Sequence, residues 1–464
     1  MDSPKQVTLV RALGPFTSTL LVAGIMIGSG VFKKIIPIAQ TGLTESWILM
    51  AWVLAGLITM MGAFNLAGLS SMTEESGGLY EYLRLSFGNL FSFLFGWTDF
   101  AIIGTASVAA LAFIFSQTIN TLVPLPNPLQ QWEHISIGQF IYPFADSGIK
   151  LLSVTIIVLL TWVNYAGVKE SGLLNNIFTS AKILGILILI ALGLFYTPKA
   201  MQPPAAAIPA ATGVLQGSAL LSAFFVTLLN VFWAYDGWVD ISAISGEIKN
   251  PRRNLPLAIF TGVSIATGLY LLVNYAYMTV LPLPALAAVS ENEIGAAVVA
   301  KTLLGNMGST LIAILIMACA FGSLNGVLLS HTRIYFRMAQ EKFFFNKAAH
   351  VHPKHRTPHI ALLYTMIWSC LLVVSGTFDM LTDMVVFATF LFYGLLAAAT
   401  LKMKRNGSVK VKVTGYPYVQ VFIILFSFTL LANTILSQPR QTLIGSCLIL
   451  SGLPLYFYFS KKQR

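Results

Sequence analysis

Apolar segments long enough to cross a lipid bilayer recur along the whole chain. A transmembrane helix needs about 20 consecutive apolar residues. Twelve segments meet this length, and we expect membrane-spanning helices at roughly residues 12–37, 44–71, 86–118, 149–166, 172–197, 217–246, 257–281, 304–337, 359–376, 380–401, 418–437 and 441–459. Only 10% of the 464 residues are charged, which excludes a soluble globular domain. The predicted fold is an all-α polytopic membrane protein with twelve transmembrane helices.

The distribution of lysine and arginine predicts the orientation of the chain. An even number of spans places both termini on one side of the membrane. If that side is the cytoplasm, 21 of the 28 lysines and arginines lie in inside segments, six lie outside, and Lys182 lies within a span. This bias predicts cytoplasmic termini in a multi-pass protein of the plasma membrane. The excess of lysine and arginine in the inside segments also explains the net charge of +11, so the charge does not indicate a nucleic-acid partner. The lipid bilayer is the expected surrounding.

The first apolar segment is interrupted in its middle, where Gly28 and Gly30 flank Ser29. Glycine in a helix interior costs about 1 kcal/mol relative to alanine, so this triplet favours an unwound backbone. Unwound backbone at membrane depth must line a protein cavity, and the helical half that follows presents free N–H groups that bind anions. We therefore predict that Gly28, Ser29 and Gly30 bind a substrate carboxylate. On this motif alone, a glycine notch for helix packing would be the preferred alternative.

The sixth apolar segment carries a matching interruption. Asp236 and Gly237 lie in the middle of the run from Trp233 to Trp238, where both residues are poor helix formers. Two interruptions five spans apart predict two five-helix units of opposite orientation, at residues 12–197 and 217–401. The two helices at 418–459 fall outside this repeat.

The two interruptions would offer complementary groups to one ligand. The second half of the first span presents N–H donors at the midplane, and the first half of the sixth span ends there in C=O acceptors. A ligand that carries both a carboxylate and an ammonium group fits such a pair. An α-amino acid is the simplest ligand of this kind.

Several motifs together resemble the amino acid–polyamine–organocation (APC) superfamily. Within it, the chain is most similar to the L-type amino acid transporter family and its bacterial serine/threonine and alanine/serine exchanger relatives. The residues that carry the resemblance are Gly24–Phe32, Glu75–Tyr80, Trp233–Trp238, Gly246–Pro256, Phe321–Gly326, His352–Lys354 and Thr357–His359. The resemblance covers the chain from about residue 12 to beyond 400. It implies a LeuT-like 5+5 inverted repeat with broken helices 1 and 6 and two added C-terminal helices.

The resemblance also implies roles for individual residues. It places the substrate carboxylate on the amides around Gly28, Ser29 and Gly30, and the substrate amino group on carbonyls near Met26, Trp233, Ala234 and Asp236. The aromatic ring of Trp233 corresponds to the external gate of the family. Two departures are visible. Thr105 stands where the third span usually carries a proline, and the loop 119–148 has no cysteine, so no disulfide-linked heavy subunit is expected.

Lys182 lies midway along the fifth span. A lysine at this depth costs about 2.5–3.5 kcal/mol, so it should face the helix bundle and have partners there. The alternative is that its side chain extends to the cytoplasmic interface. The resemblance implies a tethered cation in the place where sodium-coupled relatives bind sodium, with carbonyls near Gly24 and groups near Ser323 as partners.

Asp236 could accept a proton, contact the substrate ammonium group, or cap unwound backbone, and capping is the preferred interpretation. Glu247 is expected to form a cytoplasmic ion-pair cluster with Lys249, Arg252 and Arg253; a positively charged flank with an Asn-Pro turn is an equally good alternative.

Two other groups of residues do not predict a metal site. His350, His352, His355 and His359 lie in a basic loop in which Pro353 and Pro358 break the ligand spacing. Cys319, Cys370 and Cys447 each lie in an apolar segment, which argues against disulfides and metal binding. We expect neither a metal nor a cofactor.

The sequence thus predicts sodium-independent transport of L-amino acids, by exchange of small neutral ones of the Ala/Ser/Thr type through alternating access. A proton-coupled symporter in which Lys182 or Asp236 titrates is the first alternative. A membrane-embedded enzyme is less favoured because no metal cluster or nucleophile–base pair is visible at membrane depth. A channel is disfavoured because the spans carry no rings of charge.

Overall fold

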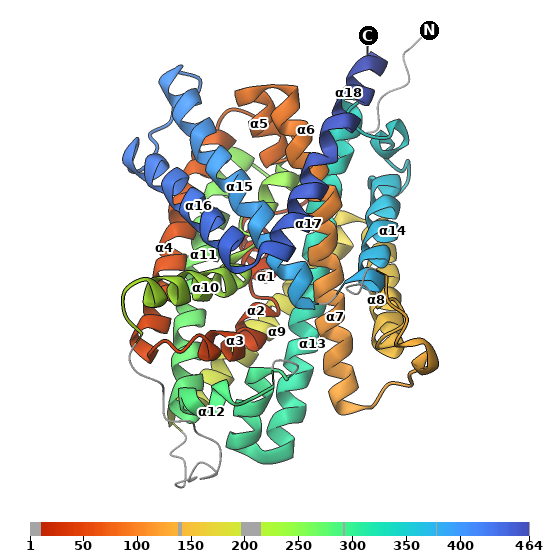
Figure 1. Cartoon of the computed structure of the whole chain (residues 1–464). Coiled ribbons are helices and arrows are strands. Elements are labelled where there is room, and N and C mark those ends of the chain that lie inside the picture. The colour runs from red at the N-terminus through yellow and green to blue at the C-terminus, as the bar shows by residue number, and fades with distance from the viewer. Residues whose placement is uncertain (1–10, 138–141, 196–214, 291–292, 377, 464) are drawn as a thin grey trace.

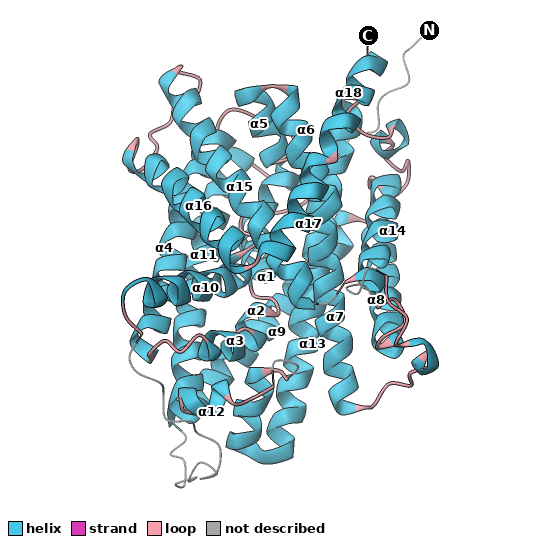
Figure 2. Ribbon diagram, viewed as in Figure 1, coloured by secondary structure: helices cyan, strands magenta, loops and turns pink. Residues whose placement is uncertain are grey.

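The computed structural model describes residues 11–137, 142–195, 215–290, 293–376 and 378–463. Nearly all of this described part is helical, as Figure 2 shows. Leu13 and Ile248 form an isolated parallel bridge. The all-α fold class predicted from the sequence is therefore confirmed.

The predicted spans correspond to helices in order along the chain. Seven of them are single helices: α4 (Glu45–Ser70), α8 (Ser147–Ala166), α9 (Val168–Phe195), α11 (Pro251–Val280), α14 (His359–Ser375), α15 (Phe378–Arg405) and α16 (Tyr418–Ser437). The eighth span lies in α13 (Gly295–Gln340), which is interrupted at Gly305. The last span consists of α17 (Pro439–Leu450) and α18 (Gly452–Gln463). In the described residues, 11 helical segments are long and apolar enough to span, and α14 is a shorter apolar helix at the ninth predicted position. The protein is thus a multi-pass membrane protein.

Both predicted interruptions are present. The first span is divided into α1 (Pro15–Met26), α2 (Gly30–Lys33) and α3 (Ile35–Gln40). The sixth is divided into α10 (Gly217–Tyr235) and the 3₁₀ segment η3 (Asp240–Glu247). Figure 1 shows the short α2 near the middle of the bundle, surrounded by long helices.

The connecting helices lie at two opposite ends of the bundle. In Figure 1, α5 (Leu79–Phe87) and the end of α18 lie at the top, whereas α12 (Leu283–Ala287) lies at the bottom. These are the segments predicted inside and outside, respectively. The division into units at 12–197, 217–401 and 418–459 stays a prediction, and residues 196 and 197 lie outside the described part of the chain.

The third span contains a local distortion. It runs through α6 (Asn89–Thr98), the π-helical turn η1 (Asp99–Ile103) and α7 (Gly104–Leu122). Just after this turn, Thr105 Oγ1 donates a hydrogen bond to Phe100 O at 2.6 Å. Such π turns within α-helices occur often at functional sites. Thr105, which stands where the resemblance implies a proline, therefore follows a widened turn. The Asp99 side chain of this turn points into the bundle.

The inner ends of the first and sixth spans are joined by backbone hydrogen bonds. Leu13 N donates to Glu247 O at 3.0 Å, and Lys249 N donates to Leu13 O at 2.9 Å. The inner half of the first span and η3 therefore form one connected piece at the predicted cytoplasmic end.

The predicted partners of Glu247 are wrong. Its carboxylate pairs with Arg333 of α13 at 2.8 Å, and both side chains are fully buried. Arg252 instead pairs with Glu74 at 3.1 Å, on the exposed side of the same end. A buried carboxylate needs a partner inside the protein, and the guanidinium of α13 provides it.

The histidines of the loop before α14 bind to the end of α8. Tyr165 Oη lies 2.9 Å from His352 Nε2, and His355 Nδ1 lies 2.9 Å from Ala166 O. His352 Nδ1 also accepts hydrogen bonds from the amides of Lys354 and His355. These contacts give His352 and His355 a structural role in holding the loop.

Candidate substrate-binding site between the two broken helices

The break in the first span is a short stretch between two helical pieces. Ile27 leaves the helical conformation (φ −75°, ψ 77°), and Gly28 N donates to Met26 O at 2.7 Å. Ser29 then precedes α2 in helical geometry. Of the three predicted amides, that of Gly28 therefore has an internal acceptor. Those of Ser29 and Gly30 lie at the start of α2, where the first amides lack intrahelical acceptors.

The break in the sixth span lies directly against the first one. A Cβ atom added to Gly30 would lie 2.7 Å from Ala234 Cα and 2.8 Å from Ala234 Cβ. Gly237 has φ +92°, and a Cβ atom there would lie 2.4 Å from Ile25 Cγ2. Each break thus needs a glycine so that its backbone can approach the other span.

Tyr270 of α11 connects the two breaks. Its hydroxyl lies 2.7 Å from Met26 O and 2.7 Å from Ala234 O, and the side chain is fully buried. A phenol has one proton to donate, so it can satisfy only one of these two carbonyls at a time, and Met26 O also accepts from Gly28 N. The sequence did not indicate this residue, because a tyrosine in an apolar helix carries no local sign of a partner 244 positions away.

A small cavity lies between the breaks. Its lining includes Met26, Gly28, Ser29, Gly30, Trp233 and Asp236 from the predicted site, together with Ile25, Ser107, Leu111, Gly237, Asp240 and Val327. Ala234 faces Gly30 and Tyr270 instead. The structure therefore brings most of the predicted carboxylate and amino-group residues to one cavity, and adds the third and eighth spans as walls.

Trp233 closes one side of this cavity. Its indole Nε1 donates to Ser29 Oγ at 3.3 Å, and its ring packs edge-on against Phe378 at a centroid distance of 6.1 Å. The ammonium group of Lys33 lies 4.2 Å from the centroid of the Phe378 ring. The indole therefore connects the first break to aromatic and cationic groups on the predicted external side. Its role as a gate stays a prediction.

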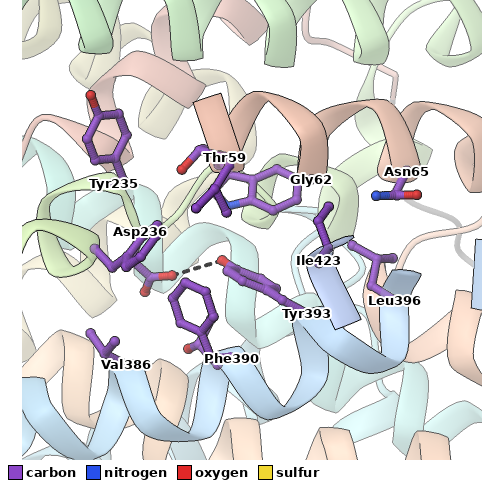
Figure 3. A pocket seen from close by; sticks show the side chains of 14 residues that line it. Thr59, Gly62, Asn65, Tyr235, Asp236, Val386, Phe390, Tyr393, Leu396 and Ile423 are labelled. Carbon is purple, nitrogen blue, oxygen red and sulfur yellow. Dashed lines mark hydrogen bonds between the residues drawn. The ribbon is translucent and has the colours of Figure 1, made fainter. Parts of the chain in front are cut away.

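Asp236 ends α10, and its carboxylate accepts a hydrogen bond from Tyr393 of α15 at 3.0 Å (Figure 3). Figure 3 shows this pair beside a second, mainly apolar pocket, which Thr59 and Phe390 also line. The sequence did not indicate Tyr393 as a partner of Asp236. The contact uses one carboxylate oxygen and leaves the role of Asp236 as a prediction.

Lys182 lies behind the cavity and is fully buried. Its Nζ lies 2.6 Å from Gly24 O, 2.9 Å from Ile27 O, 3.1 Å from Ser323 Oγ and 3.4 Å from Cys319 O. Ser323 Oγ in turn lies 2.7 Å from Gly24 O. The ammonium group therefore joins the first, fifth and eighth spans at the carbonyls that the end of α1 leaves free. Lys182, Gly24 and Ser323 do not line the cavity but support its wall.

Gly28 lies between the two clusters. It lines the cavity, and a Cβ atom added to it would lie 3.4 Å from Ser323 Oγ. A movement of the first break would therefore change both the cavity and the contacts among Lys182, Gly24 and Ser323.

Comparison with known proteins gives a consistent result along the chain. The family described as amino acid permease matches residues 13–459. A serine/threonine exchanger of Bacillus subtilis is 29% identical over 98% of both chains. The human large neutral amino acids transporter small subunit 2 is 28% identical over 97% of this chain and 81% of its own length. The human b(0,+)-type amino acid transporter 1 is 27% identical over 99% of this chain and 90% of its own.

Proposed function

The chain belongs to the amino acid permease family, and on this basis we propose that it exchanges small neutral L-amino acids across the cell membrane without sodium. Alanine, serine and threonine are the proposed substrates. The observation that carries the proposal is the cavity between the two breaks, because amides of one span and carbonyls of the other meet there. The family and the named relatives are transporters, so a membrane-embedded enzyme receives no support from them.

The substrate carboxylate would bind at the amides of Ser29 and Gly30, at the start of α2. The substrate amino group would bind among the carbonyls of Met26, Trp233, Ala234 and Asp236. Support comes from Tyr270, whose single hydroxyl proton lies between Met26 O and Ala234 O and cannot satisfy both carbonyls at once. A zwitterion is thus matched at both ends, whereas an amine or an acid alone is matched at one.

Sodium independence rests on Lys182. A permanent cation at the free carbonyls of α1 would do what a bound sodium ion does in sodium-coupled relatives, which is to connect the first and eighth spans. The 2.6 Å and 2.9 Å contacts to Gly24 O and Ile27 O support this role. Burial of an ammonium group without such acceptors would be far more costly.

We infer cytoplasmic termini from the distribution of lysine and arginine. The relatives include one named as a small subunit, which implies a partner for that protein. For this chain we propose that no disulfide-linked partner is needed, because the loop 119–148 contains no cysteine.

The test is counterflow in proteoliposomes that contain the purified protein. Labelled L-serine should enter only vesicles preloaded with amino acid, at the same rate in sodium and in choline buffer. Serine methyl ester should not compete, because it lacks the carboxylate. Uptake into empty vesicles driven by a proton gradient would replace exchange by proton symport, and strong competition by the ester would contradict the carboxylate site.

A further inference from the structure

A histidine of the eighth span is buried between two carboxylates from other spans. His331 Nδ1 lies 2.9 Å from both carboxylate oxygens of Asp99 in η1, and its Nε2 lies 3.1 Å from Asp240 Oδ2 in η3. All three side chains are buried. The imidazole therefore connects the third, sixth and eighth spans at the predicted cytoplasmic side of the cavity.

The number of protons in this bridge follows from its geometry. Two hydrogen bonds between an imidazole and two carboxyl groups need two protons, because ionised carboxylates only accept. The bridge is therefore complete either with an imidazolium and two carboxylates, or with a neutral ring and one protonated acid. If one proton leaves, a nitrogen lone pair faces a carboxylate about 3 Å away. A buried pair of acceptors is unfavourable, so one contact must break.

We propose that Asp99, His331 and Asp240 form one proton-binding site, and that its bound proton holds η3 against the third and eighth spans. This inference rests on the proposed transport function. Asp240 also lines the substrate cavity. The hydrogen bonds from Leu13 to Glu247 and Lys249 attach the inner half of the first span to η3. Opening of the cavity toward the cytoplasm by movement of these two inner halves therefore requires the His331–Asp240 contact to break.

The groups around the bridge add no competing cation. Asp236 and Tyr393 line the same small cavity as Asp99, Asp240 and His331, and its described lining contains no lysine or arginine. On α13 itself, Tyr335 Oη donates to the backbone carbonyl of Asp99 at 3.1 Å. Two carboxyl groups thus contact one imidazole and a third lines the same cavity, so a proton is the cation that the site is suited to hold.

The geometry also predicts which contact breaks. Nδ1 has two oxygens of Asp99 at 2.9 Å, whereas Nε2 has one oxygen of Asp240 at 3.1 Å, so loss of a proton should release Asp240. Exchange should then slow as the pH falls, by up to about tenfold per pH unit for a single proton. Two substitutions should remove this dependence in opposite ways.

Asp240→Asn keeps the bridge closed at every pH, because an amide accepts from an imidazole N–H and donates to a bare nitrogen. His331→Gln opens it at every pH, since both N–H groups of an amide lie on one nitrogen, which cannot replace two separate ring nitrogens, and the amide oxygen only accepts. We expect slow, pH-independent exchange for the first variant and fast, pH-independent exchange for the second.

The experiment measures serine exchange at saturating substrate in proteoliposomes with equal pH on both sides, from pH 5 to 8.5. His134→Asn, in the exposed external loop, is the control and should keep the wild-type profile. If His331→Gln does not fold, the Asp240→Asn profile decides alone. A wild-type rate that is constant or rises as the pH falls, or an unchanged profile in Asp240→Asn, overturns the proton site. Wild-type protein without flux at any pH would instead refute the transport function.

Discussion

Substitution of Gly30 by alanine tests the contact between the two breaks. The added Cβ atom would lie 2.7 Å from Ala234 Cα and 3.0 Å from Ala234 N, where ordinary carbon contacts are about 3.5–4.0 Å. The obstacle is backbone, which cannot rotate away, so the two spans must separate by up to about 1 Å. Overpacking of this kind costs about 1–3 kcal/mol. Since 1.4 kcal/mol changes an equilibrium constant tenfold, the arrangement in which the two breaks touch should become about 5- to 150-fold less populated.

The assay is serine counterflow, with yield and thermal unfolding of the purified protein as measures of folding. Alanine favours helix more than glycine does, so any loss cannot come from helix propensity at the start of α2. Gly268→Ala is the matched control, because this exposed glycine of α11 has no atom within 4 Å of the added Cβ position. Exchange of Gly30→Ala within twofold of wild type would refute the role of the contact. Gly30→Val should abolish exchange.

Three further predictions concern other parts of the molecule. Lys182→Met should leave Gly24 O and Ile27 O without their ammonium donor, so it should lower the rate of exchange more than it weakens substrate binding. Substrate binding and counterflow, measured on the same variant, separate these two effects. A wild-type rate of exchange in Lys182→Met would remove Lys182 from the mechanism. Trp233→Ala should raise KM and slow exchange while Trp233→Phe keeps much of it, and equal rates for alanine and wild type would show that the indole only packs. At the predicted cytoplasmic end, burial would raise the pKa of Glu81, but the hydrogen bond from Arg84 and the charge of Arg337 outweigh it and hold the pKa below its ordinary value. That stabilisation is present above the pKa of the unfolded state and is lost as the pH falls through the pKa of the folded state. The Tm of the wild-type protein should therefore decrease when the pH is lowered below about 5, and the Tm of Glu81→Gln should decrease less.

The spans and their interruptions were predictable because their signals are local. Length and hydropathy place each helix, and the start and end of α16 agree with the prediction of 418–437. Glycines and an aspartate within apolar runs mark the breaks. The eighth span agrees as well: Gly305 (φ +63°, ψ −148°) separates a preceding helix that begins at Gly295 from the long helix that follows, close to the predicted start at 304.

The partners of polar groups were less predictable, because they depend on helix packing. His331 was not singled out at all, since one histidine near the end of an apolar helix does not indicate two carboxylates 232 and 91 positions away. The partner predicted for Glu247 was wrong for a related reason. The nearby arginines of its own loop are exposed, whereas Arg333 reaches it from another span.

The carbonyls that a broken helix leaves free explain why those hidden partners exist. The end of α1 cannot satisfy Gly24 O, Met26 O and Ile27 O within the helix, and no bulk water is available at this depth. Lys182 and Ser323 supply donors to Gly24 O and Ile27 O, and the hydroxyl of Tyr270 lies between Met26 O and Ala234 O of the opposite break. Each donor comes from a different span, so the breaks are held open by the packing of the bundle. A substrate amino group must then compete only for the remaining lone pairs, which selects a ligand that brings its own carboxylate to the amides of α2.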